Sequence, residues 1–185
     1  MDVFQAIYQR ASVGKVKSDP LPQEVIEKLL AAAVQAPNHF KVRPWRFVVI
    51  SGEARLRLGD VMAEILRAQK PDLPVEGLKA EHDKALRSPV IIAIGVDAPE
   101  NPKVLEVENI CAAAAAAQNM LLAAEAMGLA SVWRTGPAAY NPAVKAFLGL
   151  QPEQHLIGFI YLGYAETERP PSERPGFEDR TTWLV

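Results

Sequence analysis

Three segments of the sequence carry side chains that could hold a charged or aromatic ligand. The first contains Arg10, Ser12 and Lys15. Arginine offers a planar fork of donors, serine adds a hydroxyl, and the intervening Gly14 lets backbone N–H groups approach closely, so the set suits a phosphate. Two basic residues on a loop are more often solvated surface charge, and this segment alone is a weak sign.

The other two segments lie beside elements that should be buried. Gln35 to Trp45 combines an amide, the imidazole of His39 and several cations around two prolines. Trp133-Arg134-Thr135 follows the apolar stretch 129–132, and polar groups at such a strand end commonly line a ligand crevice. The structural alternatives are a core position for Trp45 and an ordinary surface position for His39.

Familiar hydrolytic, metal and nucleotide motifs are absent. The sequence contains no G-x-S-x-G, no G-x-x-x-x-G-K-[ST] and no G-x-G-x-x-G. The three histidines, His39, His82 and His155, are far apart and lack the companions of a metal site, so we expect no metal. A site that carries an organic cofactor is the best remaining enzymatic interpretation.

Bulk composition favours one ordinary domain over residues 1–185. Hydrophobic residues make up 49% and charged residues 23%, while the net charge of −2 and pI near 6.0 argue against a nucleic-acid partner. No signal peptide is visible at the N-terminus, which favours a cytoplasmic protein. The single Cys111 cannot form an internal disulfide, and we expect it to be buried as a small hydrophobe.

Helical and strand patterns mix without a strict βαβ alternation, which favours an α+β fold with one sheet layered by helices. Pro71–Gly77 should be irregular and Leu78–Arg87 a charged surface helix. The other expected helices are Val3–Gln9, a segment from Pro22 to Ala36, Glu53–Gln69 and Pro142–Phe147, and the expected strands are Trp45–Ser51, Leu129–Val132, Val90–Val96 and His155–Tyr164.

The longest predicted element is a helix from Val107 to Met127 that Gly128 ends. Its surface is apolar on nearly every side from Ile110 to Ala124, so it should be buried all round. The partner is either the rest of the domain or a second subunit. Polar residues interrupt the stretch, so we expect no membrane span.

Taken together, four segments resemble the nitroreductase family, most closely its short bacterial branch of YdjA-like NAD(P)H nitroreductases. The segments are Arg10-Ala-Ser12, Ala36-Pro-Asn-His39 with Arg43-Pro-Trp45, Gly128 to Gly136, and Ile157 to Gly163. They occur in the family's order and spacing over almost the whole chain. The resemblance implies a homodimeric α+β flavoprotein with a central mixed or antiparallel sheet and a long buried central helix. It also implies FMN at the interface between two chains.

By position, the resemblance assigns FMN contacts to eight residues: Arg10, Ala11, Ser12, Gln35, His39, Trp133, Arg134 and Thr135. The C-terminal segment 165–185 should reach over the partner subunit. Two residues depart from the family pattern. Ala11 stands where a second arginine is usual, so phosphate charge must come from Arg10, Lys15 or Arg134, and Arg43 replaces a glutamine. Arg174 is a loose counterpart of a basic residue near the family's C-terminus.

The implied function is an FMN-dependent NAD(P)H oxidoreductase. NADH or NADPH would reduce the flavin at N5, and a nitroaromatic or quinone-like acceptor would then take the hydride in a ping-pong cycle. No side chain needs to act as a catalytic acid or base, because the flavin carries the chemistry. Two alternatives stay open: a flavin-binding or regulatory protein without turnover, and a member specialised for flavin destruction or dehalogenation.

Overall fold

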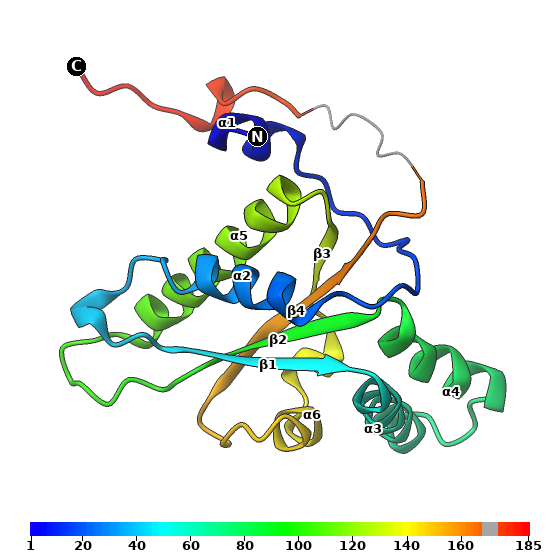
Figure 1. Cartoon of the computed structure of the whole chain (residues 1–185). Coiled ribbons are helices and arrows are strands. Elements are labelled where there is room, and N and C mark those ends of the chain that lie inside the picture. The colour runs from blue at the N-terminus through cyan, green and yellow to red at the C-terminus, as the bar shows by residue number, and fades with distance from the viewer. Residues whose placement is uncertain (168–173) are drawn as a thin grey trace.

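A four-stranded antiparallel sheet forms the centre of the computed structural model, which describes residues 1–167 and 174–185 (Figure 1). The strands lie in the order β1-β2-β4-β3. Their bounds are Trp45–Ser51 for β1, Val90–Val96 for β2, Ala130–Arg134 for β3 and His155–Gly163 for β4. The structure confirms an α+β fold, with an antiparallel rather than a mixed sheet.

Helices cover both faces of this sheet (Figure 1). In the described ranges the α-helices are α1 (Val3–Gln9), α2 (Gln23–Ala33), α3 (Glu53–Gln69), α4 (Val75–His82), α5 (Glu106–Ala126) and α6 (Pro142–Phe147). Local signals begin two of them as expected. Asp2 and Gln5 form a capping box at α1, and the Asn141 side chain accepts a hydrogen bond from the Ala143 N–H at α6.

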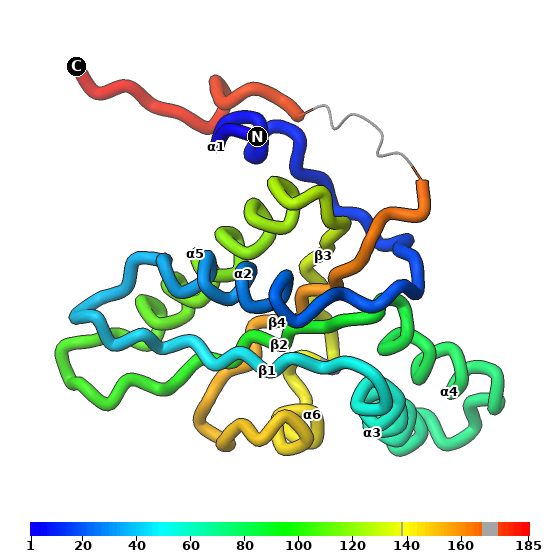
Figure 2. The backbone as a smooth tube through the Cα atoms, viewed as in Figure 1, coloured from blue at the N-terminus to red at the C-terminus, as the bar shows by residue number. Residues whose placement is uncertain are grey.

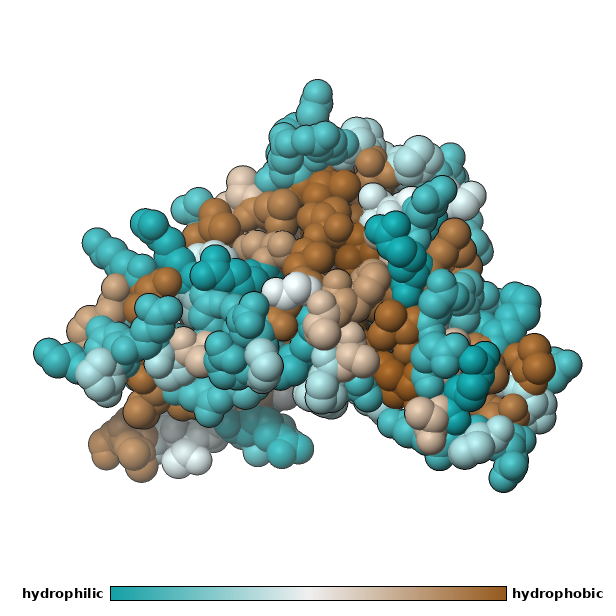
Figure 3. Space-filling model, turned by 90° about the horizontal axis from the view of Figure 1, so that it is seen from below, coloured by the Kyte–Doolittle hydropathy of each residue, from teal (hydrophilic) through white to brown (hydrophobic). Residues whose placement is uncertain are grey.

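Alternation of side chains along the strands builds two cores, one on each face. Ile92, Ile94 and Ile160 pack with α2 and α5, whereas Ile91 and Phe159 pack with α3 and α6. All seven residues of β2 are buried, as the continuous apolar run predicts. Seen from the α3 and α6 side, hydrophobic surface gathers near the middle of the molecule and polar surface surrounds it (Figure 3).

The expectation for the segment between α3 and β2 is partly wrong. Helix α4 begins at Val75, inside the stretch 71–77 that composition marks as irregular, and it ends at His82. Pro74 holds φ at −58°, which presets the entry into a helix, and Gly77 is tolerated inside the helix against Leu73. A 3₁₀ turn, η2 (Asp83–Leu86), replaces the expected end of the helix.

Within one chain, the central helix α5 is buried on one side only, so the all-round burial predicted from its sequence would require a second subunit on the other side. Ala113, Ala116 and Ala117 have no exposed surface, because they face the sheet and α2. The opposite side remains exposed, and Cys111 lies on it rather than in the core. This exposed stripe consists of Val107, Cys111, Gln118 and Met127, with Ala114, Ala115 and Leu122 half-buried beside it.

Helix α1 packs against α5, and the C-terminal segment returns to the end of α1. The Arg174 Nη2 donates a hydrogen bond to the Arg10 carbonyl at 2.9 Å, and the last residues then extend away from the domain (Figure 2). Trp183 is 75% exposed. Residues 168–173 of the expected extension 165–185 lie outside the described residues. Among the helices of the described ranges, none is long and apolar enough to cross a membrane.

Candidate functional site

The segment after α1 lies against the start of β3. Ser12 and Ser131 form an isolated parallel bridge, and the Val13 N–H donates to the Ser131 carbonyl at 2.9 Å. This pairing places Arg10, Ala11 and Ser12 beside the strand that carries Trp133 to Thr135. Two of the segments singled out in the sequence, more than 120 residues apart in the chain, are therefore neighbours in the fold.

Strand β3 is an edge strand whose outer side is only partly covered. Its inner side pairs with β4 over its whole length. Because the Ser131 carbonyl faces outward to Val13, backbone alternation turns the N–H and C=O groups of Trp133 and Thr135 to the same outer side. An edge of this kind offers donors and acceptors to a bound molecule.

The side chains of Trp133 and Arg134 lie on opposite faces of the sheet. Trp133 packs toward the α5 side, where its Nε1 donates to the Ile157 carbonyl at 3.2 Å. Gly158 makes this approach possible, since a Cβ there would stand 2.4 Å from Trp133 Nε1. The guanidinium of Arg134 lies instead over the ring of Tyr161 on the α3 side, 5.5 Å from its centroid.

Arg134 borders two neighbouring cavities. The larger, about 490 Å³, is lined by residues that include Met62, Glu81, Arg87, Arg134, Phe159 and Tyr161, and we call it the Arg134 cavity. A second cavity of about 440 Å³ shares Arg87 and Arg134 and is also bordered by Lys15 and Glu166. Arg134 Nη2 lies only 2.8 Å from where a Cβ of Gly14 would stand, so glycine gives the guanidinium its room.

The charges around these cavities are mostly positive. Lys84 pairs with Glu81 at 2.5 Å, and among the described residues Arg87 and Arg134 of the larger cavity have no ion-pair partner. Burial raises the pKa of the Tyr161 phenol, and the nearby guanidinium groups of Arg134 and Arg87 oppose that rise. The phenol therefore stays protonated at neutral pH and can donate a hydrogen bond.

A second cationic pair forms where α1 ends. Burial lowers the pKa of the Arg10 guanidinium, the positive charge of Arg174 lowers that pKa further, and the negative charge of Glu125 opposes the decrease. An anionic ligand beside the two arginines would add to the compensation that Glu125 supplies. The pair lies beside Ser12, so a hydroxyl donor is also at hand.

His39 lies far from this group within one chain, whereas Gln35 follows the end of α2. Gln35 is exposed and donates to the Ala31 carbonyl at 3.3 Å, while His39 Nε2 stands 3.4 Å from Glu108 in the first turn of α5. Arg10 lies near the other end of α5, where the negative charge of Glu125 raises the pKa of its guanidinium. Seventeen residues of helix separate these two glutamates, or about 25 Å. One chain therefore splits the expected site into two halves.

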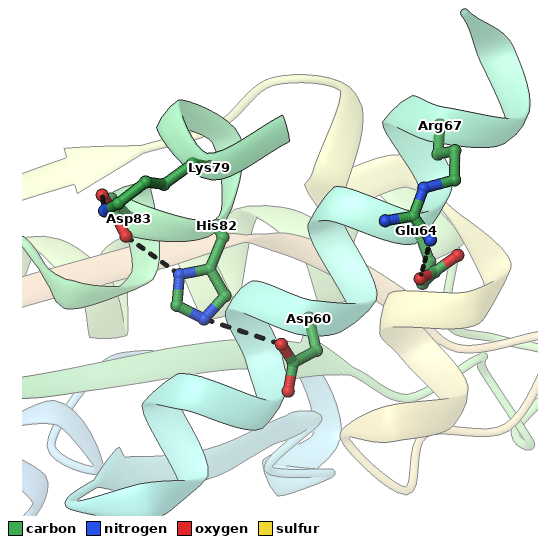
Figure 4. A network of polar contacts seen from close by, with 6 residues as sticks. All are labelled: Asp60, Glu64, Arg67, Lys79, His82 and Asp83. Carbon is green, nitrogen blue, oxygen red and sulfur yellow. Dashed lines mark hydrogen bonds and ion pairs between the residues drawn. The ribbon is translucent and has the colours of Figure 1, made fainter. Parts of the chain in front are cut away.

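A polar network positions α4, which supplies one wall of the Arg134 cavity. His82 Nδ1 lies 3.0 Å from Asp83 and Nε2 lies 3.6 Å from Asp60 of α3, while Lys79 contacts Asp83 at 2.5 Å (Figure 4). The helices approach closely at Gly59, where a Cβ would stand 2.7 Å from the His82 carbonyl oxygen. The wall residue Glu81 directly precedes His82.

Sequence reasoning missed Arg87, Glu81 and Tyr161 as residues of this site. Tyr161 belongs to an apolar strand that reads as core, and the run of charges before β2 reads as a solvated helix. A polar atom on a buried strand is the one local sign that could have singled out Tyr161. In the described ranges, no group of three or more His, Cys, Asp or Glu side chains is placed to hold a metal.

A model of the nitroreductase family matches residues 7–164. The chain belongs to the nitroreductase family. Over 165 residues it is 31% identical to "Putative NAD(P)H nitroreductase YdjA" of Escherichia coli K12, which covers 88% of each chain. This confirms the resemblance inferred from the sequence.

Two solved structures confirm the nitroreductase-like fold. A nitroreductase-like family protein from Bacillus cereus superposes with a TM-score of 0.85 at 26% identity, covering 100% of this chain and 96% of that one. A protein from Desulfovibrio desulfuricans, solved in complex with FMN, superposes with a TM-score of 0.78 at 27% identity, covering 100% and 98%.

Proposed function

We propose that this nitroreductase-family chain is an FMN-dependent NAD(P)H oxidoreductase that reduces nitroaromatic or quinone-like acceptors. The observation that carries the proposal is the pairing of Ser12 with Ser131. It joins a cationic, hydroxyl-bearing segment to the free edge of β3. Support comes from the relative named an NAD(P)H nitroreductase and from the similar structure that contains FMN.

The residues present fit such a cofactor. The like-charged pair Arg10 and Arg174, beside Ser12, would hold the phosphate, and Ala11 would contribute only its backbone. The outer backbone edge at Trp133 and Thr135 would hold the ring system. Arg134, whose buried Nε has no hydrogen-bond partner within the described part of the chain, would supply positive charge nearby.

Bound FMN would supply hydride transfer between NADH or NADPH and the acceptor, in a ping-pong cycle. The protein's contribution is to bind and orient. The Trp133 ring is fixed by its hydrogen bond to the Ile157 carbonyl and by close packing against Gly158, which has no side chain to displace it. These contacts restrict the motion of the adjacent edge of β3. No side chain of the site needs to transfer a proton in the hydride step.

A complete site requires two chains in this proposal. His39 lies near the N-terminal end of α5, and Arg10 lies near its C-terminal end. If the α5 helices of two chains pack antiparallel through their exposed stripes, the His39 region of one chain lies beside the Arg10 region of its partner. The dimer would then contain two such sites, one at each end of the helix pair. Exposed apolar side chains of α1, such as Phe4 at 65%, would be covered in the same assembly. The exposed C-terminal Trp183 would also pack on the partner.

Purification of the full chain tests the proposal. We expect a yellow protein that NADH or NADPH bleaches without air, and reoxidation on addition of a nitroaromatic or a quinone. Arg10→Ala should weaken FMN binding at least about tenfold, since it removes a charge-assisted contact. Arg57→Ala, at an exposed position of α3, is the control.

A colourless protein that takes up no FMN would overturn the proposal. Colour without bleaching would favour the flavin-binding alternative that lacks turnover. Unchanged FMN affinity in both Arg10→Ala and Arg134→Ala would show that the site is wrongly placed.

A further inference from the structure

The Arg134 cavity contains two guanidinium groups without an acidic partner. Neither Arg87 nor Arg134 makes an ion pair within the described ranges, and Arg134 Nε is buried without a hydrogen-bond partner. Leaving a buried N–H unsatisfied is costly, and two like charges that border one cavity repel each other. An anionic oxygen in the cavity would relieve the repulsion between the two guanidinium groups.

The acidic groups nearby do not fulfil this role. Glu81 is held by Lys84 at 2.5 Å, and that ammonium also borders the cavity. Glu166 borders the neighbouring cavity and is exposed. Neither carboxylate forms an ion pair with Arg87 or Arg134 among the described residues, so both guanidinium groups are available to an anionic ligand.

The apolar part of the cavity fits a flat ring. Phe159 and Tyr161 project from β4 beside Val132 of β3, and Met62 of α3 faces them. The volume of about 490 Å³ lies in the range of cavities that hold small organic ligands. Aromatic groups favour planar partners, while the Tyr161 hydroxyl adds a polar contact.

We propose that the Arg134 cavity binds an oxyanion, a carboxylate or a phosphate, that one of the two substrates carries, with Arg87 and Arg134 as its ligands. This inference rests on the proposed function and deepens it, because it names the class of substrate that the site prefers. The cavity borders Trp133 and Thr135, where the proposed flavin would lie, yet it extends to the opposite face of the sheet from the Trp133 ring. An anionic substrate could thus be anchored on one face while its reactive group reaches the edge of β3.

Arg87 is the residue to change, because it is not among the residues proposed to hold FMN. Arg87→Met removes the charge and keeps the length of the side chain, and Arg87→Lys restores the charge without the planar fork. Arg57→Met, which removes the same charge from the exposed surface of α3, is the matched control. All variants are measured as purified full-length protein, and the kinetic comparisons use its flavin-bound form.

Two arms separate the possible sources of the oxyanion. The first compares kcat/KM for 4-nitrobenzoate and for neutral 4-nitrobenzamide, and the second compares NADPH with NADH. We expect Arg87→Met to lower one of these two ratios about five- to tenfold, with partial recovery in Arg87→Lys and no change in Arg57→Met. A fall in the first ratio assigns the site to the acceptor, and a fall in the second assigns it to the phosphate of the donor.

Direct titration keeps the inference separate from the proposed function. Benzoate and inorganic phosphate are titrated into each variant, with the fluorescence of the tryptophans or the heat of binding as the signal, whether or not the protein holds FMN. Weaker binding of either probe to Arg87→Met than to Arg57→Met supports the anion site even if no flavin is present. Unchanged kinetic ratios together with equal binding in all variants would overturn it.

Discussion

Replacing Gly59 with alanine should push α4 away from α3. A Cβ at this position would stand 2.7 Å from Cδ2 of His82 and 2.7 Å from the His82 carbonyl oxygen. Real contacts of a Cβ are essentially never that short, and the carbonyl oxygen cannot rotate away as a flexible side chain can. Helix α4 must therefore move, and with it the Glu81 wall of the Arg134 cavity.

The magnitude follows from two opposing terms. Alanine in the middle of a helix is favoured over glycine by about 1 kcal/mol. Overpacking of a well-filled contact costs about 1–3 kcal/mol, and the backbone atom in this contact favours the upper part of that range. We expect Gly59→Ala to lower the free energy of unfolding by about 1–2 kcal/mol, or the Tm by about 2–6 °C.

Urea denaturation should compare the free energy of unfolding of Gly59→Ala with that of a second glycine variant. Gly77→Ala in α4 gains the same helix propensity, but its Cβ would meet only side-chain atoms of Leu73, the nearest at 2.9 Å. Because that side chain can rotate, Gly77→Ala should leave the free energy of unfolding unchanged or raise it by up to about 1 kcal/mol. Gly59→Ala should also weaken benzoate binding to the Arg134 cavity, whereas Gly77→Ala should not.

The double variant Gly59→Ala/His82→Ala separates the ring from the backbone. Only part of the lost stability should return, since the carbonyl contact persists after the imidazole is removed. If Gly59→Ala is as stable as Gly77→Ala, the close approach of α3 and α4 is not a determinant of this fold, and the reasoning is refuted.

Three further predictions concern the other contacts described above. Cys111→Arg, on the exposed stripe of α5, should weaken self-association at least about tenfold and lower the FMN content, whereas Cys111→Ser should not; equal sedimentation of both variants would contradict the two-chain site. Asp83 has its carboxyl pKa lowered by Lys79 and His82, so its contribution to stability is present above the unfolded pKa near 4 and is lost as the pH falls through the lower folded value. Asp83→Asn should therefore lower the Tm at pH 7 but not at pH 2. The control Asp72→Asn, at an exposed position, should leave the Tm unchanged at both pH values. Gly158→Ala, at φ +141° and with its Cβ 2.4 Å from Trp133 Nε1, should cost about 3 kcal/mol in urea denaturation and shift the Trp133 fluorescence.

The local pattern of the sequence was sufficient for most elements. Strands β1 and β2 and helices α1, α3 and α6 begin and end at the predicted residues, because their caps, glycines and apolar runs are local signals. The segment before β2 was predicted less well. The start of α4 at Val75 depends on its packing against α3, and composition alone marks Pro71 to Gly77 as irregular.

The sequence by itself determined the family and which segments carry polar chemistry. Only the tertiary structure decided how those segments combine. A strand turns neighbouring side chains to opposite faces, so Trp133 and Arg134 serve different sides of the sheet, and which helices cover each side depends on packing. The length of α5 likewise separates His39 from Arg10. No local pattern encodes that distance, because it arises from the whole fold.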